Sequence, residues 1–68
     1  MISLHETYMN YAYREAEKAF EKNEIPVGCI IVFQNSIIAK AHNQVESLKD
    51  PTAHAEILAI TSAAEYLQ

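Results

Sequence analysis

The spacing of apolar residues divides the chain into four segments. In the first, from about Leu4 to Asn23, apolar residues recur at the three- and four-residue intervals of one helix face. These residues are Tyr8, Tyr11, Ala12, Ala16, Ala19 and Phe20. The charged run from Glu15 to Glu24 falls largely between them and is interpreted as a solvated face. Ser3 and Glu6 have the spacing of a capping box, so the segment is predicted to be an amphipathic helix that starts there.

The next two segments have the pattern of strands. Residues Ile25 to Phe33 form an apolar run, rich in β-branched residues, that is typical of a strand buried on both faces. Pro26 has no N–H to donate, so it marks the start of this strand or a bulge. Ile37 to His42 is predicted to be a second strand, antiparallel to the first, because Gln34-Asn35-Ser36 suits a tight hairpin turn. A polar loop is expected from Asn43 to Lys49.

The last segment is predicted to be a helix that begins at Asp50-Pro51. Asp is a preferred N-cap residue and Pro is favoured at the first helical position. Apolar residues then recur at steps of three and four to the end of the chain: Ile57, Ile60, Ala64 and Leu67. The order helix–strand–strand–helix predicts a layered α/β fold, in which helices pack on an antiparallel hairpin. Two strands alone are marginally stable, so we expect this chain to be part of a larger α/β domain or half of an assembly.

Composition narrows the class of protein. The chain has 68 residues, of which 50% are hydrophobic and 21% charged, as expected of one globular domain at most. Five basic and nine acidic residues give a net charge of −4, so binding of nucleic acid by charge alone is not expected. No apolar run is long enough to span a membrane, and no signal peptide is visible. The single cysteine, Cys29, excludes an internal disulfide, and a cytoplasmic protein is expected. Because a chain this short usually needs a further source of stability, a metal, a partner or additional chain is expected to supply it.

The segment from Asp50 to Glu56 carries the candidate chemistry. His54 and Glu56 are expected in the first turns of the last helix. A neutral imidazole there is a good zinc ligand, and a carboxylate beside a metal-bound water can move its proton to a leaving group. However, residues two apart on a regular helix point about 200° from each other. A bare His-x-Glu is also common by chance, so a helix-end His with a solvated Glu is the alternative interpretation.

The wider context of this motif resembles a known family. Three strings follow one another at compact spacing: Glu24-Ile25-Pro26-Val27-Gly28, His42-Asn43 and Asp50-Pro51-Thr52-Ala53-His54-Ala55-Glu56. Over nearly its whole length the chain thus resembles the N-terminal half of the cytidine deaminase superfamily, and the bacterial tRNA-specific adenosine deaminases in particular. Guanine deaminases that act on the free base share the third string. The first string looks more like the tRNA enzymes.

The resemblance implies roles for four residues. His54 matches the histidine zinc ligand, Glu56 the proton-shuttling glutamate and Asn43 an asparagine that hydrogen-bonds the target base, while the backbone N–H of Ala55 would lie near the reacting centre. In the family, zinc activates the water that attacks C6 of adenine, and Glu56 would carry protons to the departing ammonia.

The resemblance also implies a whole-protein function. Residues 1–68 would be the N-terminal part of a single cytidine-deaminase-like domain that uses zinc, acts on the wobble adenosine of tRNA and forms a homodimer. A guanine or cytosine deaminase acting on the free base is one alternative. A non-catalytic truncated homologue, acting as an interaction module, is the other.

The chain departs from the family at the other zinc ligands. Two cysteines of a Pro-Cys-x-x-Cys string complete the family's site, and this sequence has no such string. A catalytic zinc takes three protein ligands, so the 68-residue chain alone is expected to be inactive. Cys29 lies on the first strand and is interpreted as a core residue. Structural or surface positions are predicted for the other candidates: His42 at a strand end, Tyr8 and Tyr11 in the core, His5 and Tyr13 at the surface.

Overall fold

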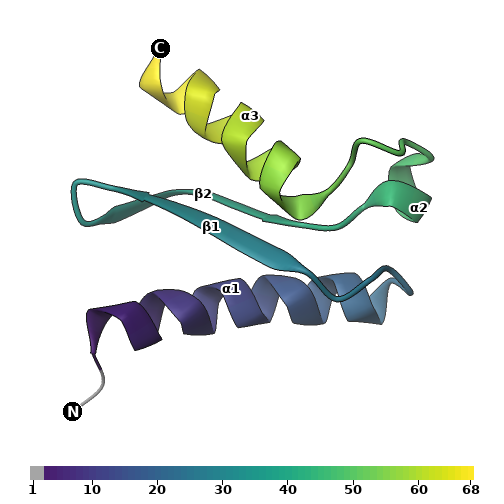
Figure 1. The fold of residues 1–68 in the computed structure, drawn as a ribbon, viewed down its shortest axis with the longest axis horizontal. Coiled ribbons are helices and arrows are strands. Elements are labelled where there is room, and N and C mark those ends of the chain that lie inside the picture. Colours follow the sequence, from purple (N-terminus) through teal and green to yellow (C-terminus); the bar gives the residue numbers. More distant parts are fainter. Residues whose placement is uncertain (1–2) are drawn as a thin grey trace.

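Two helices enclose a β-hairpin in the computed structural model, which describes residues 3–68. The elements are α1 (Leu4–Glu21), β1 (Gly28–Phe33), β2 (Ser36–His42), a short α2 (Val45–Leu48) and α3 (Ala55–Leu67). The two strands pair antiparallel, with α1 along one face of the sheet and α3 on the other (Figure 1). The predicted layered α/β fold and its order of helix, two strands and helix are confirmed, and α2 is an addition.

The start of α1 and the hairpin turn follow from local sequence. The hydroxyl of Ser3 accepts a hydrogen bond from the N–H of Glu6 at 3.1 Å, so the predicted cap is confirmed. The helix ends at Glu21, two residues early, and Asn23 then takes a left-handed φ of 61°. Gln34 and Asn35 have φ values of 49° and 63°, which is the backbone of a two-residue turn that matches the twist of a hairpin.

Close packing of α1 on the sheet depends on Gly28, the first residue of β1. A Cβ atom there would lie 2.1 Å from the carbonyl oxygen of Ala12 and 2.5 Å from the nitrogen of Ala16. Any larger residue would push the helix away from the strand. The prediction that the strand starts at Ile25 is wrong, because Ile25 to Val27 form an exposed connection that turns tightly at Pro26, where the N–H of Val27 donates to the carbonyl of Ile25 at 2.8 Å.

The hydrophobic core is thin: among residues 3–68, every buried apolar residue is an alanine. On α3 these are Ala55, Ala59 and Ala63, and the last two pack against Ala39 and Ala41 of β2. The apolar stripe that predicted this helix lies on its other side, where Ile60 is 60% exposed. Small residues thus let α3 approach the sheet and leave its large ones uncovered.

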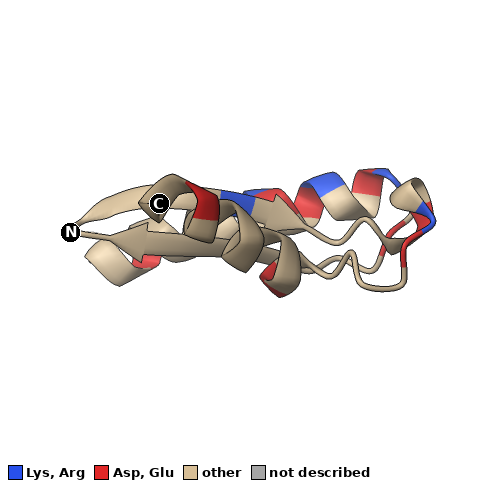
Figure 2. Cartoon of the chain, turned by 90° about the horizontal axis from the view of Figure 1, so that it is seen from above, with Lys and Arg blue, Asp and Glu red and all other residues tan. Residues whose placement is uncertain are grey.

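The molecule is a slab about one element thick, which leaves both of its broad faces bare. Its Cα atoms extend over 38 × 32 × 10 Å (Figure 2). The prediction that the first strand is buried on both faces is wrong for residues 3–68: β1 is half-buried at best, and Phe33 is 45% exposed. Acidic and basic positions are intermixed along the slab (Figure 2), and no helix of the described residues could cross a membrane.

Two boundaries after β2 differ from the predictions. The expected loop from Asn43 to Lys49 contains the helical turn α2. The helix predicted from Asp50-Pro51 begins only at Ala55. The reason is local: a carboxylate oxygen of Asp50 accepts hydrogen bonds from the N–H of Thr52 at 2.9 Å and from its hydroxyl at 2.7 Å. The capping capacity of Asp50 therefore stabilises a turn that precedes the helix.

Candidate functional site

Asn43 and Ala55 join the end of β2 to the start of α3. Asn43 is 4% exposed, and its Oδ1 atom accepts a hydrogen bond from the backbone N–H of Ala55 at 2.7 Å. This bond satisfies one of the N–H groups that a helix start leaves without a partner. Asn43, which lies outside α3, thus caps the start of that helix. The side-chain amide of Asn43 keeps two N–H donors for another partner. Binding of a base by Asn43 and Ala55 stays a prediction.

His54 precedes the helix, and Glu56 lies in its first turn. His54 is the N-cap residue of α3, with an extended backbone (φ −79°, ψ 148°), and its exposed side chain makes no capping bond. The angle of about 200° between residues two apart holds only inside a regular helix. Because His54 lies outside the helix, that objection to a joint role for His54 and Glu56 does not apply. The roles of the two side chains stay predictions.

A cavity of about 210 Å³ lies beside Asn43 and His54. Its other walls include Glu24 and Ile25, from the connection between α1 and β1, and Glu46 of α2. A larger groove of about 560 Å³ lies along α1, lined by Tyr13, Phe20 and other residues, but neither His54 nor Asn43 borders it. The chemistry of the side chains therefore marks the smaller cavity as the candidate site.

Glu24 is buried, although the charged run from Glu15 to Glu24 was predicted to be a solvated face. It is 6% exposed and accepts hydrogen bonds from the start of α2, including the N–H of Glu46 at 3.0 Å. Burial raises the pKa of Glu24, but its hydrogen bonds with Ser47 and Glu46 and the charge of His42 outweigh burial and lower it overall. Within the string from Glu24 to Gly28 that carried the family resemblance, Glu24 thus has a structural role: its hydrogen bonds fix α2, which forms part of the cavity wall.

The interpretation of Cys29 as a core residue agrees with its packing. Cys29 is half-buried on β1 and packs against the alanine cluster between the sheet and α3. Burial raises the pKa of its thiol, and the negative charge of Glu56 raises it further. The thiol therefore stays protonated at neutral pH.

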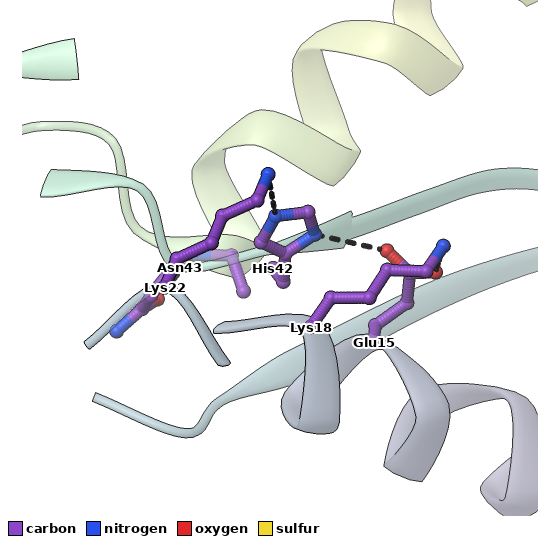
Figure 3. A network of polar contacts seen from close by, with 6 residues as sticks. Glu15, Lys18, Lys22, His42 and Asn43 are labelled. Carbon is purple, nitrogen blue, oxygen red and sulfur yellow. Dashed lines mark hydrogen bonds and ion pairs between the residues drawn. The ribbon is translucent and has the colours of Figure 1, made fainter. Parts of the chain in front are cut away.

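Glu15 was also predicted to be solvated, and the structure buries it. It is 5% exposed and meets His42, the residue at the end of β2, at a distance of 3.2 Å between Oε1 and Nδ1 (Figure 3). A signal was present in the sequence, since Glu15 is three residues after Ala12 and four before Ala19 on the same helix face. His5 and Tyr13 are exposed as predicted, and Tyr8 and Tyr11 are half-buried.

Zinc fits these residues only in part. The exposed imidazole of His54 is a suitable ligand. Within residues 3–68, however, no three His, Cys, Asp or Glu side chains come together in a group that could hold a metal. A catalytic zinc takes three protein ligands, so residues 3–68 do not form a complete site by themselves, and the role of His54 as one ligand stays a prediction.

Residues 2–68 match the family model of the cytidine and deoxycytidylate deaminase zinc-binding region. The chain belongs to this family. It is also 61% identical over 62 residues to the tRNA-specific adenosine deaminase of Aquifex aeolicus. The matched region covers 91% of this chain and 41% of that protein.

Two solved structures are similar to this chain. One belongs to work on A-to-I editing by tRNA:A34 deaminases at the wobble position of transfer RNA. It has a TM-score of 0.86 and 41% identity over 90% of this chain and 44% of that one. The other is guanine deaminase of Bacillus subtilis, with a TM-score of 0.86 and 39% identity over 93% of this chain and 41% of that one. The chain thus spans about two fifths of the length of these proteins.

Proposed function

We propose that the protein carrying this chain is a zinc-dependent hydrolytic deaminase that converts adenosine to inosine at the wobble position of tRNA. The observation that carries this proposal is the arrangement at the start of α3, where Asn43 caps the helix, His54 precedes it and Glu56 follows. The similarity to tRNA-specific adenosine deaminases supports adenosine in tRNA as the substrate. Residues 1–68 would be the N-terminal part of a single deaminase domain.

Each of the four residues has a role in this proposal. Glu56 takes a proton from the attacking water and delivers it to the departing ammonia, which is general acid–base catalysis. Asn43 and the backbone N–H of Ala55 hold the base. His54 is one zinc ligand, and two cysteines that this chain lacks complete the set, as in the family. Zinc, when bound, supplies a Lewis acid. The 68-residue chain alone would be inactive.

Two finer features belong to the proposal. The first is a homodimer: the exposed apolar stripe of α3, which includes Ile57, Ile60 and Leu67, is a face that a second copy could cover. The second is a cytoplasmic location, where a tRNA substrate would be found and where a lone cysteine such as Cys29 stays reduced.

A guanine deaminase is the second candidate, because the guanine deaminase structure matches this chain with the same TM-score as the tRNA enzyme. The experiment that separates the two supplies the full-length, zinc-loaded protein with an anticodon stem-loop bearing the wobble adenosine, with free guanine and with free cytosine. Inosine formed in the stem-loop, without ammonia from the free bases, is the expected result.

Deamination of guanine or cytosine alone would replace the proposed substrate. No deamination of any of the three by the zinc-loaded protein would favour the non-catalytic homologue. The Glu56→Gln variant, run in parallel, shows whether a measured activity belongs to this site.

A further inference from the structure

Glu15 is a carboxylate buried between α1 and the sheet. A buried carboxylate is costly unless it is paired, and Glu15 has two partners (Figure 3). Its Oε2 atom accepts a hydrogen bond from Nζ of Lys18 at 2.7 Å, and its Oε1 atom lies 3.2 Å from Nδ1 of His42. Burial raises the pKa of Glu15, but hydrogen bonds and charges from Lys18 and His42 outweigh burial, so the group stays ionised at neutral pH.

The backbone brings this carboxylate to the end of β2. Gly28 pairs with His42 across the sheet, and a Cβ atom on Gly28 would lie 2.8 Å from the Cβ atom of Glu15. Residues that face each other across an antiparallel pair project to the same side of the sheet. The side chain of His42 therefore extends over Gly28 to the α1 side, where Glu15 meets it.

His42 and Asn43 are held on opposite faces of the sheet. Successive residues of a strand point to opposite faces. His42 contacts Glu15 of α1, whereas the next residue, Asn43, accepts the N–H of Ala55 of α3 at 2.7 Å. The backbone N–H of Asn43 also donates to the carbonyl of Val27 at 3.1 Å. The end of β2 is thus fixed to both helices, and one of these contacts belongs to the candidate site.

We propose that Glu15 and His42 form a positioning pair for the substrate site, because their contact fixes the end of β2 and so holds Asn43 against the first N–H of α3. This inference rests on the proposed function, in which Asn43 binds the base. Neither Glu15 nor His42 touches the substrate in this role. Loss of the pair weakens binding of the base and leaves the chemistry of Glu56 intact, so it raises KM and leaves kcat nearly unchanged.

The kinetic test uses the full-length, zinc-loaded protein with the wobble-adenosine stem-loop as substrate. Glu15→Met and His42→Leu both remove the contact, and Glu15→Gln keeps an acceptor for the ring N–H of His42. Glu17→Gln is the matched control on the exposed side of α1. Loss of one hydrogen bond predicts that KM rises about five- to ten-fold in the first two variants, with kcat within about two-fold.

The outcomes separate positioning from a merely structural role. Glu15→Gln and Glu17→Gln are expected to keep the parent KM. The double variant Glu15→Met/His42→Leu is expected to lose no more than His42→Leu, which also removes the contact of 3.4 Å between Nζ of Lys22 and Nε2 of His42. If Glu15→Met does not fold, His42→Leu is the variant that tests the proposal. In His42→Leu the buried carboxylate of Glu15 keeps its ion pair with Lys18, so this variant is expected to fold. An unchanged KM in His42→Leu, or a fall in kcat alone, overturns the proposal.

A second measurement does not depend on activity. Hydrogen exchange of the Ala55 amide in the substrate-free, full-length protein is expected to be faster in His42→Leu than in the parent and unchanged in Glu17→Gln. Equal exchange in His42→Leu and the parent shows that the pair does not hold Asn43. If exchange responds as expected but even the parent protein does not deaminate the stem-loop, the proposed function fails while the positioning of Asn43 stands.

Discussion

Glu24 holds Ser47 through a single carboxylate oxygen, which accepts the backbone N–H at 2.6 Å and the hydroxyl at 2.7 Å. Its other oxygen accepts the N–H of Glu46. The N-cap residue of α2, Gln44, makes no capping bond with its side chain. A carboxylate from the connection between α1 and β1 therefore replaces the missing cap and fixes α2 across the cavity.

Replacement of Glu24 should loosen α2. Gln keeps one acceptor oxygen and Ala keeps none, so exchange of the Glu46 and Ser47 amides is expected to rise from the parent to Glu24→Gln and again to Glu24→Ala. Hydrogen exchange in the full-length protein measures this order. Glu21→Gln, an exposed neighbour, is the control and should leave both amides unchanged. Equal protection in the parent and Glu24→Ala would contradict the capping role.

Glu56→Gln should abolish most of the deamination and keep the zinc. Gln has the shape of Glu but is not a base, and general acid–base catalysis typically contributes about 10²- to 10⁴-fold in rate. The loss of kcat is expected in that range, with zinc content at the parent level. Glu65→Gln, at an exposed position of the same helix, is the control. Deamination at near the parent rate in Glu56→Gln would remove Glu56 from the mechanism.

His54→Ala should lose the metal and the activity together. The exposed imidazole of His54 makes no capping hydrogen bond to α3, and in the proposed function it is a zinc ligand. Zinc per chain, measured by elemental analysis of the full-length protein, is expected to fall well below one. His5→Ala, an exposed histidine of α1, should bind zinc as the parent does. Full zinc content in His54→Ala would show that other residues hold the metal.

The free energy of unfolding should fall at acidic pH, and protonation of Glu15 should account for part of the loss. Its pKa in the folded protein is below the ordinary value of 4.5, so below that pH the unfolded chain binds more protons than the folded one. The stability that Glu15 contributes is present above pH 4.5 and decreases as the pH falls through the folded-state pKa. Urea midpoints of the full-length protein are expected to drop less on acidification in Glu15→Gln than in the parent. Parallel curves would assign the acid sensitivity to other carboxylates.

The 68-residue chain by itself should associate or fold poorly. Its core holds only alanines as buried apolar residues among those described, and large side chains such as Phe20 and Ile60 are exposed. Sedimentation is expected to show oligomers or an expanded chain, and zinc should not bind stoichiometrically. A compact, cooperatively unfolding monomer would contradict the first expectation. A tightly bound zinc that Cys29→Ala removes would contradict the interpretation of Cys29.

Local signals in the sequence determined the secondary structure and the family. The Ser3 cap, the turn at Gln34 and Asn35 and the periodicity of α1 depend on residues within a few positions of each other. The string from Asp50 to Glu56 selected the deaminases in the same way. The same string did not predict the start of α3 correctly. The Asp50 side chain can accept hydrogen bonds in a turn as well as at a helix start, and here it accepts the N–H of Thr52 in a turn.

The tertiary structure decided which charged residues are buried and what they hold. Glu15 lies on the buried face of α1 and Glu24 follows that helix, but their partners His42 and Ser47 lie 27 and 23 positions away in the sequence. Helix periodicity describes one element and contains no information on such partners. The buried face of α3 follows the same principle: close approach to the sheet requires small residues, so Ala59 and Ala63 pack inside and the larger Ile57 and Ile60 stay outside.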